Sequence, residues 1–358
     1  MKNVLVTGAG GYIGSILVPK LLEKNYTVTV IDRFFFGVDK LQPHNNLTII
    51  HEDCRRLKEE HFIDVDAVID LVAISNDPSG ELFKEVTYEV NFAARVNTAM
   101  LAKKMGVERY ILPSSCSIYG FQDKDTIVDE YAETNPLTVY AKANEGAENG
   151  VLPLAEDNFT VTVMRQATVY GYSPRMRFDL AVNGMTYGAW ENGIIPLMRD
   201  GSQWRPMVHV EDTTDVMCLL LEADAHMVNG EIFNVGSKRN NYQLGPLAEE
   251  IAAALPIDVK IEWYGEPDHR SYRVNFEKIE NALNWEANYT AADGALQIYQ
   301  KLEAGTLEKT EQTITLNWYK ELIKWQNIMK QVGMYGGILE IQKNDQLSIA
   351  HRSRGVFF

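Results

Sequence analysis

The chain of 358 residues is long enough for one large α/β domain or two coupled domains with a sizeable buried core. Apolar residues make up 46% and charged residues 23%, a globular composition that excludes a disordered or collagen-like chain. The formal net charge of -15 argues against nucleic acid and anionic membrane surfaces as partners, because both repel an acidic protein.

The cysteines and the N-terminal segment bear on the compartment. Cys54, Cys116 and Cys218 form no CxxC pair, which favours a reducing compartment without disulfides. No stretch of 18 apolar residues occurs, and the chain enters an apolar strand directly, without the charged region or cleavage site of a signal peptide. We therefore expect a cytoplasmic protein.

Short β-branched runs alternate with helical patterns in the first half of the chain. Residues 13–24 and 92–105 carry helical periodicity, and strands are predicted at residues 4–6, 28–31, 47–50, 67–73, 109–114 and 160–164. This alternation is typical of βα units around a doubly wound parallel sheet. The sequence thus predicts an α/β, Rossmann-type fold.

The pattern loosens after residue 166. Residues 171–205 hold Gly, Pro, Arg and aromatic side chains in place of clean strands. Further strands are predicted at residues 208–210, 232–235 and 259–264, with helices at 247–254 and 314–329. We expect residues 1–170 to form a Rossmann domain with a return segment near 206–236. Residues 171–205 and 237–310 would form a smaller α/β lobe, and residues 311–358 a C-terminal helix and tail.

A glycine-rich loop follows the first predicted strand. In this GxxGxxG, Gly8 permits a tight turn, Gly11 allows a pyrophosphate to approach the backbone, and Gly14 allows close packing of the helix, whose N-terminus offers free N–H groups. The second strand ends at Asp32, whose carboxylate can accept hydrogen bonds from both ribose hydroxyls and would repel a 2′-phosphate. The motif predicts NAD in preference to NADP, although the neighbouring Arg33 could favour NADP.

A serine and a tyrosine belong to two short motifs 25 residues apart. Ser115 ends a predicted strand, and Tyr140 follows 25 residues later in the helix-like Tyr-Ala-Lys-Ala-Asn-Glu. With the Thr-Gly-x-x-Gly-x-x-Gly loop, the strand end at 165–171 and Arg205-x-x-x-His-Val, these motifs resemble the extended short-chain dehydrogenase/reductase family. The resemblance is to its NAD-dependent nucleotide-sugar epimerases and dehydratases, and it covers about residues 1–300.

The resemblance implies roles for individual residues. In such enzymes a tyrosinate takes a proton from a sugar hydroxyl while a hydride passes to the nicotinamide, and a Ser or Thr shares the hydrogen bond; by position these are Tyr140 and Ser115. The implied NAD contacts are Gly8, Gly11, Tyr12, Ile13, Gly14, Asp32, Asp53, Asn91, Tyr140 and Asn144, with Asp53 at the adenine edge. The implied contacts to a nucleotide-diphosphate sugar are Ser115, Thr168, Arg205 and, at a second phosphate position, Arg270 or Arg273.

The arginines of this set suit a pyrophosphate, because a guanidinium makes bidentate contacts with phosphate. Arg175 and Arg177 are further candidates on weaker grounds. Thr168 departs from the family, in which many relatives have an asparagine that contacts the sugar nucleotide.

A second departure concerns the family pattern Tyr-x-x-x-Lys. Asn144 stands where the lysine is expected, at the i, i+4 spacing that puts it on one helix face with Tyr140. In the family that lysine holds the nicotinamide ribose and lowers the pKa of the tyrosine. Without it the pH optimum should be alkaline, and Asn144→Lys should raise the rate near neutral pH. Three interpretations stay open: activation of Tyr140 by the cofactor's positive ring and another group, altered chemistry, or lost turnover.

The reaction type follows by elimination. Family dehydratases carry an Asp-Glu pair after the catalytic residue and decarboxylases keep the Glu, but here Cys116 and Ser117 stand at these positions, so neither reaction has its acid or base. Cys116 is one position out of register with the cysteine of 3,5-epimerases, so we expect a small buried cysteine. The sequence predicts an NDP-sugar epimerase that retains NAD. An NDP-keto-sugar reductase and a catalytically silent binding protein are the alternatives.

Three further expectations concern metal ions, one histidine and assembly. No His, Cys, Asp or Glu set has metal-ligand spacing, so no metal is expected. His209 lies in a short apolar strand and is expected to be structural. The family resemblance implies a homodimer through the helices near residues 92–105 and 140–150, which show amphipathic faces.

Overall fold

The computed structural model describes residues 2–123, 126–198, 200–265 and 270–333. Within them, seven parallel strands form one sheet in the order β11-β7-β5-β4-β1-β2-β3. Their bounds are β1 (Asn3–Thr7), β2 (Thr27–Asp32), β3 (Leu47–His51), β4 (Ala67–Asp70), β5 (Arg109–Ser115), β7 (Thr160–Gln166) and β11 (Glu231–Val235). The predicted α/β, Rossmann-type fold is confirmed. The strand predicted to reach residue 73 ends at Asp70.

Helices cover both faces of this sheet. Along β1, Val4 and Val6 join one apolar core and Leu5 joins the other, because successive side chains of a strand point to opposite faces. One core includes α1 (Gly14–Glu23) and α7 (Val210–Glu222), and the other includes α4 (Arg95–Lys104) and α5 (Val139–Val151). The expected helix at residues 92–105 is a π-helical segment, Glu89–Ala94, followed by α4.

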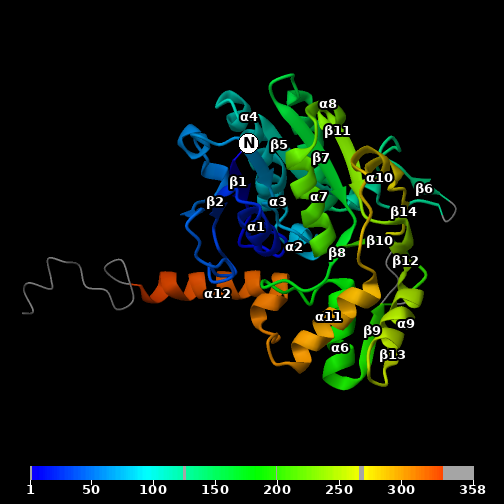
Figure 1. Ribbon diagram of the computed structural model, residues 1–358. Coiled ribbons are helices and arrows are strands. Elements are labelled where there is room, and N and C mark those ends of the chain that lie inside the picture. Colours follow the sequence, from blue (N-terminus) through cyan, green and yellow to red (C-terminus); the bar gives the residue numbers. More distant parts are fainter. Residues whose placement is uncertain (1, 124–125, 199, 266–269, 334–358) are drawn as a thin grey trace, which may run out of the picture.

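A second group of elements lies at one end of the large sheet (Figure 1). Its strands are β8 (Thr168–Tyr170), β10 (Trp204–His209) and β12 (Asn241–Gln243) in one sheet, and β9 (Ile194–Met198) and β13 (Lys260–Tyr264) in another. Its helices α6 (Ala181–Asn192), α9 (Leu244–Ala254) and α11 (Ala291–Glu303) share one apolar core with these strands. The strand predicted at residues 208–210 is thus the end of β10, and Val210 begins α7.

The helix α6 and the strand β9 fall where the sequence predicted no clean elements. Two glycines interrupt the apolar pattern of α6, so the helix cannot be recognised from the periodicity of its apolar residues. Their role is close packing: a Cβ at Gly188 would lie 2.6 Å from the carbonyl oxygen of Ile194, and one at Gly184 would lie 2.7 Å from that of Phe178.

Shorter elements complete the described chain. They are α2 (Asp77–Leu82), α3 (Lys84–Tyr88), β6 (Ile127–Val128), α8 (Ala225–Val228), β14 (Arg273–Val274) and α10 (Glu277–Leu283). The late helix α12 (Thr315–Val332) matches the prediction closely and crosses beside the loop after β2, where Trp318 Nε1 donates to the carbonyl of Phe35 at 2.5 Å (Figure 1). The rest of the predicted tail, 334–358, lies outside the described residues. The division of the chain into domains stays a prediction.

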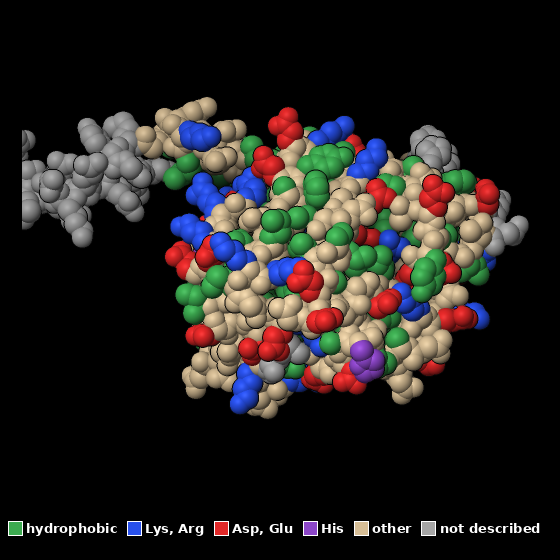
Figure 2. Space-filling model, turned by 90° about the horizontal axis from the view of Figure 1, so that it is seen from above, with side chains coloured by type: hydrophobic (Ala, Val, Ile, Leu, Met, Phe, Trp, Pro, Cys, Tyr) green, Lys and Arg blue, Asp and Glu red, His purple; other side chains and the backbone are tan. Residues whose placement is uncertain are grey.

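The surface carries mixed chemistry. Acidic, basic and hydrophobic side chains are interspersed on the face that Figure 2 shows. Within the described part of the chain, no helix combines the length and apolar character needed to cross a bilayer.

Candidate active site

A cavity of about 1360 Å³ extends from the glycine loop of the large sheet to the second group of elements. Its wall includes Gly8, Asp32, Ser115, Tyr140 and Arg205, which are separated by up to 197 positions in the sequence. A ligand-sized cleft at the carboxyl ends of parallel strands is the usual position of a binding site in this type of sheet.

The glycine loop has little room for side chains. Gly8 has a φ of +67°, and a Cβ there would lie 2.6 Å from the backbone nitrogen of Val72. A Cβ at Gly14 would lie 2.4 Å from the carbonyl oxygen of Ala9, so the helix α1 packs directly on the loop. Glycine is therefore required for the turn and for this packing, while Gly11, Ile13 and Tyr12 complete the cavity wall.

Asp32 closes the turn from the end of β2. Its Oδ2 accepts a hydrogen bond from the backbone N–H of Gly10 at 2.9 Å, and its Oδ1 accepts one from that of Phe34 at 2.6 Å. Burial raises the pKa of Asp32, and these backbone donors counteract the shift. A fixed carboxylate on the cavity wall suits a ribose diol and opposes a phosphate.

Asp53 is a fixed anion on the same side of the cavity. It pairs with Arg55 at 2.7 Å and with Arg33 at 3.3 Å. The Arg55 hydrogen bonds lower the pKa of Asp53 to about 2. Arg33 is thus engaged by Asp53, and its guanidinium lies 4.4 Å from the centre of the Phe35 ring.

Two expected cofactor residues act in different ways. The Tyr12 hydroxyl donates to the carbonyl of Gly171 at 2.5 Å and so joins the glycine loop to the chain beyond β8. The buried Asn91 is not among the wall residues; its amide accepts from the N–H of Ile74 at 2.8 Å and donates to the carbonyl of the same residue at 3.0 Å. Asn91 therefore shapes the loop after β4, which lines the cavity.

Tyr140 and Ser115 lie together on the cavity wall. Burial and the carboxylate of Asp77 raise the pKa of Tyr140, whereas the Ser115 hydrogen bond, Arg95 and Arg177 lower it. Both side chains line the cavity. A tyrosine beside a hydroxyl on an open cavity wall can exchange a proton with a bound alcohol.

Asn144 lies behind Tyr140 and is not among the wall residues. It is 1% exposed, and its Nδ2 donates to the backbone carbonyl of Tyr140 at 2.9 Å. Its Oδ1 accepts from Arg95 Nη1 at 3.1 Å. The sequence did not point to Arg95, since nothing near it in the chain marks it as part of a site.

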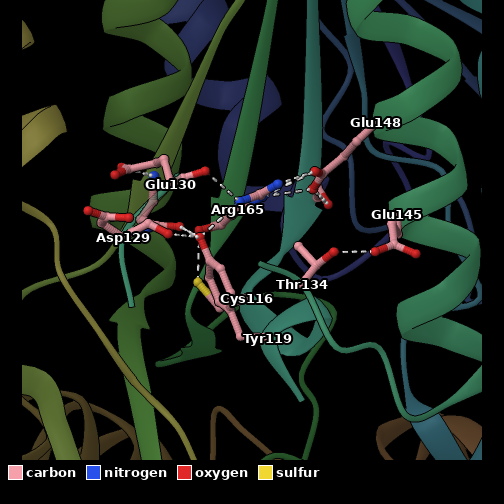
Figure 3. Close-up of polar contacts among 10 residues, drawn as sticks. Cys116, Tyr119, Asp129, Glu130, Thr134, Glu145, Glu148 and Arg165 are labelled. Carbon is pink, nitrogen blue, oxygen red and sulfur yellow. Dashed lines mark hydrogen bonds and ion pairs between the residues drawn. The ribbon is translucent and has the colours of Figure 1, made fainter. Parts of the chain in front are cut away.

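A buried polar network sets α5 against the sheet. Arg165 of β7 pairs with Glu148 of α5 at 2.8 Å, and the hydroxyl of Ser114 on β5 donates to the same carboxylate. Figure 3 shows Arg165 between Glu148 and the backbone carbonyl of Glu130. Because α5 carries Tyr140 and β5 ends at Ser115, this network aligns the two.

The second group of elements brings some of the predicted arginines to the cavity. Arg205 and Arg270 line it, and Arg205 Nη1 donates to the carbonyls of Trp204 at 2.8 Å and of Arg270. Arg270 also pairs with Asp77, which accepts a hydrogen bond from Thr138. Thr168 is on the wall as well, whereas Arg273 is not among the wall residues.

Arg273 instead contacts an aromatic ring. Its guanidinium lies 4.9 Å from the centre of the Trp204 ring. Of the two alternatives at 270 and 273, the structure therefore brings Arg270 to the cavity.

Arg175 and Arg177 have stronger grounds than the sequence offered. Both line the cavity, and Arg177 forms a bidentate pair with Asp179 at 2.8 and 3.1 Å. Arg175 is 4% exposed, and among the described residues its Nε and Nη1 have no hydrogen-bond partner. A buried guanidinium with unused donors on a cavity wall suits an anionic group of a ligand.

The residues after Ser115 carry no carboxylate into the cavity. Cys116 is 1% exposed, its thiol donates to the carbonyl of Arg165 at 3.1 Å, and burial raises its pKa. The expectation of a small buried cysteine is confirmed. Ser117 lines the cavity, and its buried hydroxyl has no partner within the described residues.

Gln203 is a cavity residue that the sequence did not indicate. It is 4% exposed, and neither its amide oxygen nor its amide nitrogen has a partner in the described part of the chain. A polar ligand would satisfy both atoms. No pattern in the sequence distinguishes this glutamine from a surface residue.

His209 is structural, as predicted. It is fully buried, contacts Gln297 at 3.1 Å and stacks on Tyr289 with 4.2 Å between ring centres. No group of three or more potential metal ligands occurs among residues 2–123, 126–198, 200–265 and 270–333.

Comparison with known proteins identifies the family. The family model described as NAD dependent epimerase/dehydratase family matches residues 4–236. The chain belongs to this family. The resemblance seen in the sequence is thus confirmed, and so is NAD as the cofactor of the family to which the chain belongs.

Similar curated proteins include two from Arabidopsis thaliana. The putative UDP-arabinose 4-epimerase 2 is 28% identical over 344 residues, which cover 84% of this chain and 80% of that protein. The UDP-glucuronic acid decarboxylase 6 is 28% identical over 315 residues, covering 82% and 86%. Epimerases and decarboxylases therefore both occur among the relatives.

Solved structures share the fold. The UDP-glucuronic acid 4-epimerase from Bacillus cereus in complex with UDP-glucuronic acid and NAD has a TM-score of 0.76 at 21% identity, covering 84% of this chain and 99% of that chain. The dTDP-glucose 4,6-dehydratase from Bacillus anthracis in complex with NAD has a TM-score of 0.73 at 23% identity, covering 91% and 98%.

Proposed function

We propose that the chain is an NAD-dependent epimerase of a nucleotide-diphosphate sugar. The observation that carries the proposal is the pair Tyr140 and Ser115 on the wall of a cavity that also holds the glycine loop and Arg205. The cavity of about 1360 Å³ exceeds the usual volume of a site for one small ligand, which suits a dinucleotide beside the glycine loop and a second phosphorylated ligand beside Arg205. Relatives named as UDP-arabinose 4-epimerases make UDP-sugars the first substrates to test.

The site residues divide between the two ligands. The glycine loop, Asp32, Asp53 and the unpaired donors of Arg175 suit NAD, and Asn91 supports that site through the loop at Ile74. The proposed residues of the sugar-nucleotide site are Ser115, Ser117, Thr168, Gln203, Arg205 and Arg270.

The chemistry is oxidation and re-reduction of one sugar carbon. Bound NAD supplies reversible acceptance of a hydride. Tyr140, as the phenolate, takes the hydroxyl proton as the carbonyl forms, and Ser115 steadies the oxygen by a hydrogen bond. On re-reduction Tyr140 gives the proton back to the oxygen, and because bound NAD would accept and return the same hydride, no redox equivalent would be consumed. With no carboxylate at Cys116 or Ser117, elimination and decarboxylation have no base there.

The test is turnover with a panel of UDP-, GDP-, CDP- and dTDP-sugars in the presence of NAD. We expect an epimer of at least one substrate, detected by NMR, with no net formation of NADH. Tyr140→Phe should bind the substrate without converting it. Consumption of one nicotinamide per product would identify a reductase, and tight binding with no product would identify a silent binding protein.

We also propose a homodimer and a cytoplasmic location. Exposed apolar side chains gather on α3, the π-helical segment and α4, namely Val86, Tyr88, Phe92 and Met100. A second copy would remove them from water. One chain has a mass of 40.5 kDa. Light scattering should give twice that mass for the wild-type protein and the mass of one chain for Phe92→Glu. The three cysteines, all buried and free, suit a reducing compartment.

A further inference from the structure

A buried guanidinium lies next to Asn144, on the element that packs against α5. Arg95 is 1% exposed, and its Nη1 donates to Asn144 Oδ1 at 3.1 Å. Its Nη2 donates to the backbone carbonyls of Asp70 at 2.9 Å and of Pro113 at 2.5 Å. The sequence places Arg95 and Asn144 49 positions apart, and the packing of α4 on α5 joins them.

The pairing of Arg95 leaves its charge incompletely neutralised. A buried charge is costly unless an opposite charge meets it closely. Arg165 meets Glu148 at 2.8 Å, but Arg95 Nε is 3.7 Å from Asp70 Oδ2 and, within the described residues, forms no hydrogen bond. The Asp70 carboxylate instead accepts hydrogen bonds from Thr7 and Tyr110. An arginine that served packing alone would be expected to pair as Arg165 does.

Asn144 links this charge to the tyrosine. It stands one helical turn after Tyr140, and its Nδ2 donates to the backbone carbonyl of Tyr140 at 2.9 Å. The amide is therefore held between the guanidinium of Arg95 and the turn of α5 that carries the phenol. Burial raises the pKa of Tyr140, and the positive charge of Arg95 opposes this shift because it favours the phenolate.

We propose that Arg95, held in place by Asn144, supplies Tyr140 with the positive charge that a lysine at position 144 would otherwise supply. This inference rests on the proposed function and deepens it. Arg95 is not among the wall residues of the cavity, so it is a positioning residue that acts through the tyrosine. It also explains the asparagine: a lysine at 144 would set an ammonium against the guanidinium and remove the acceptor of Nη1.

Other charges also face Tyr140. Asp77 of α2 opposes the phenolate and Arg177 of the loop after β8 favours it. Asp77 is itself paired with Arg270, and Asp70 offsets part of the charge of Arg95. Arg95 is therefore one of several charges that act on the phenol, and its loss should raise the pKa of Tyr140 further.

The first experiment is the pH profile of kcat/KM for Arg95→Gln. Loss of the cation should move the acid limb upward by about one pH unit. Below that limb the rate should fall roughly tenfold, and at high pH it should return to the wild-type value, since the tyrosine is then ionised in both proteins. Arg109→Gln is the matched control, because Arg109 is also buried but stands at the opposite end of β5 from Ser115. Its limb should not move.

The second experiment moves the positive charge from position 95 to position 144. Asn144→Lys alone should lower the rate, which reverses the expectation from the sequence, and Arg95→Gln with Asn144→Lys should recover most of it. If Arg95→Gln does not fold, Asn144→Asp takes its place. A carboxylate at position 144 would pair with Arg95 and neutralise its charge, so the acid limb of the pH profile should again move to higher pH. A higher rate for Asn144→Lys alone, or unmoved limbs in Arg95→Gln and Asn144→Asp, would overturn the proposal.

A titration without turnover separates this inference from the proposed function. The ultraviolet difference spectrum between the NAD-loaded protein and its Tyr140→Phe variant reports ionisation of that phenol alone. If no NDP-sugar is converted, the proposed function fails, and the phenol titration still decides the role of Arg95. An identical titration of Tyr140 in wild type and Asn144→Asp would refute that role even in an active epimerase.

Discussion

At the scale of single residues, the site depends on a few fixed charges at the two ends of one cavity. Asp32 and Asp53 lie near the glycine loop, and Arg205 and Arg270 lie on the second group of elements. Each forms hydrogen bonds with the backbone or with a partner side chain, so its charge is already oriented. Such preorganisation reduces the cost of ordering side chains when a ligand binds.

Asp32 should determine cofactor preference. We expect wild type to bind NAD more tightly than NADP, because the fixed carboxylate repels a 2′-phosphate. Asp32→Asn should reduce the ratio of NAD affinity to NADP affinity roughly tenfold or more, since the amide keeps one hydrogen-bond acceptor and removes the negative charge. Calorimetric titration of the cofactor-free protein with both dinucleotides measures this. Equal affinities in wild type, or tighter NADP binding that Arg33→Ala abolishes, would contradict it.

Arg205 should act on the substrate and not on NAD. Arg205→Ala is expected to weaken the best sugar nucleotide by roughly 10- to 100-fold, the value of a hydrogen bond to a charged group. The affinity for NAD should change little. Arg273→Ala is the matched control, because this arginine packs on Trp204 and is not among the wall residues of the cavity. If the two variants bind sugar nucleotides equally well, Arg205 does not belong to the site.

At the scale of elements, the position of α5 decides whether Tyr140 meets Ser115. Two buried contacts hold this helix: Glu148 binds Arg165 and Ser114 near its C-terminal half, and Asn144 binds Arg95 one turn earlier. Two of these partners, Arg165 and Arg95, are buried guanidinium groups, and they add to the apolar packing of Ala147 and Val151 of the same helix. Polar contacts of this kind have fixed geometry, which suits a helix that must aim a catalytic side chain.

Glu148→Gln should destabilise the protein strongly. The variant leaves the guanidinium of Arg165 buried without a counter-charge, and breaking such a pair costs about 3 to 5 kcal/mol. Denaturant unfolding followed by circular dichroism measures the loss. Glu222→Gln is the control: its pair with Lys24 is exposed, so the expected loss is below about 1 kcal/mol. Equal losses in the two variants would show that the network of Figure 3 is not a structural anchor.

At the scale of the whole molecule, the two groups of strands meet around buried polar residues as well as apolar ones. His209 ends β10 at the start of α7, where its Nδ1 accepts from the backbone N–H of Glu211 at 3.2 Å. Burial lowers the pKa of His209 to about 4 from an ordinary 6.5. Folding therefore requires the neutral imidazole, and protonation favours the unfolded chain.

This histidine should make stability depend on pH. Between pH 6.5 and 4 the unfolded state binds a proton at His209 that the folded state does not, so its contribution is present above pH 6.5 and is lost as the pH falls towards 4. The loss amounts to about 3 kcal/mol over that window. His209→Asn should lower stability at pH 7.5 and flatten the slope between pH 6.5 and 4. An unchanged slope would assign the acid sensitivity to other groups.

The sequence by itself determined what depends on local patterns. The βα alternation predicted the parallel sheet, and the GxxGxxG between a strand and a helix predicted the loop that the cavity uses. The family resemblance of the segments around Ser115 and Tyr140 assigned both residues to one site. Both line the cavity, because the end of a parallel strand and the helix that follows it lie at one edge of the sheet. These features need only neighbours in the chain.

Tertiary structure alone decided which side chains share a site across long separations. The sequence presented Asn144 as a missing charge, whereas the packing of α4 on α5 brings the guanidinium of Arg95 to its amide. Likewise, two arginines three residues apart were equivalent candidates until the fold turned Arg270 towards the cavity and Arg273 onto Trp204. The physical reason is that a hydrogen bond or ion pair requires contact between two atoms, and no periodicity within one segment records which distant segment supplies the second atom.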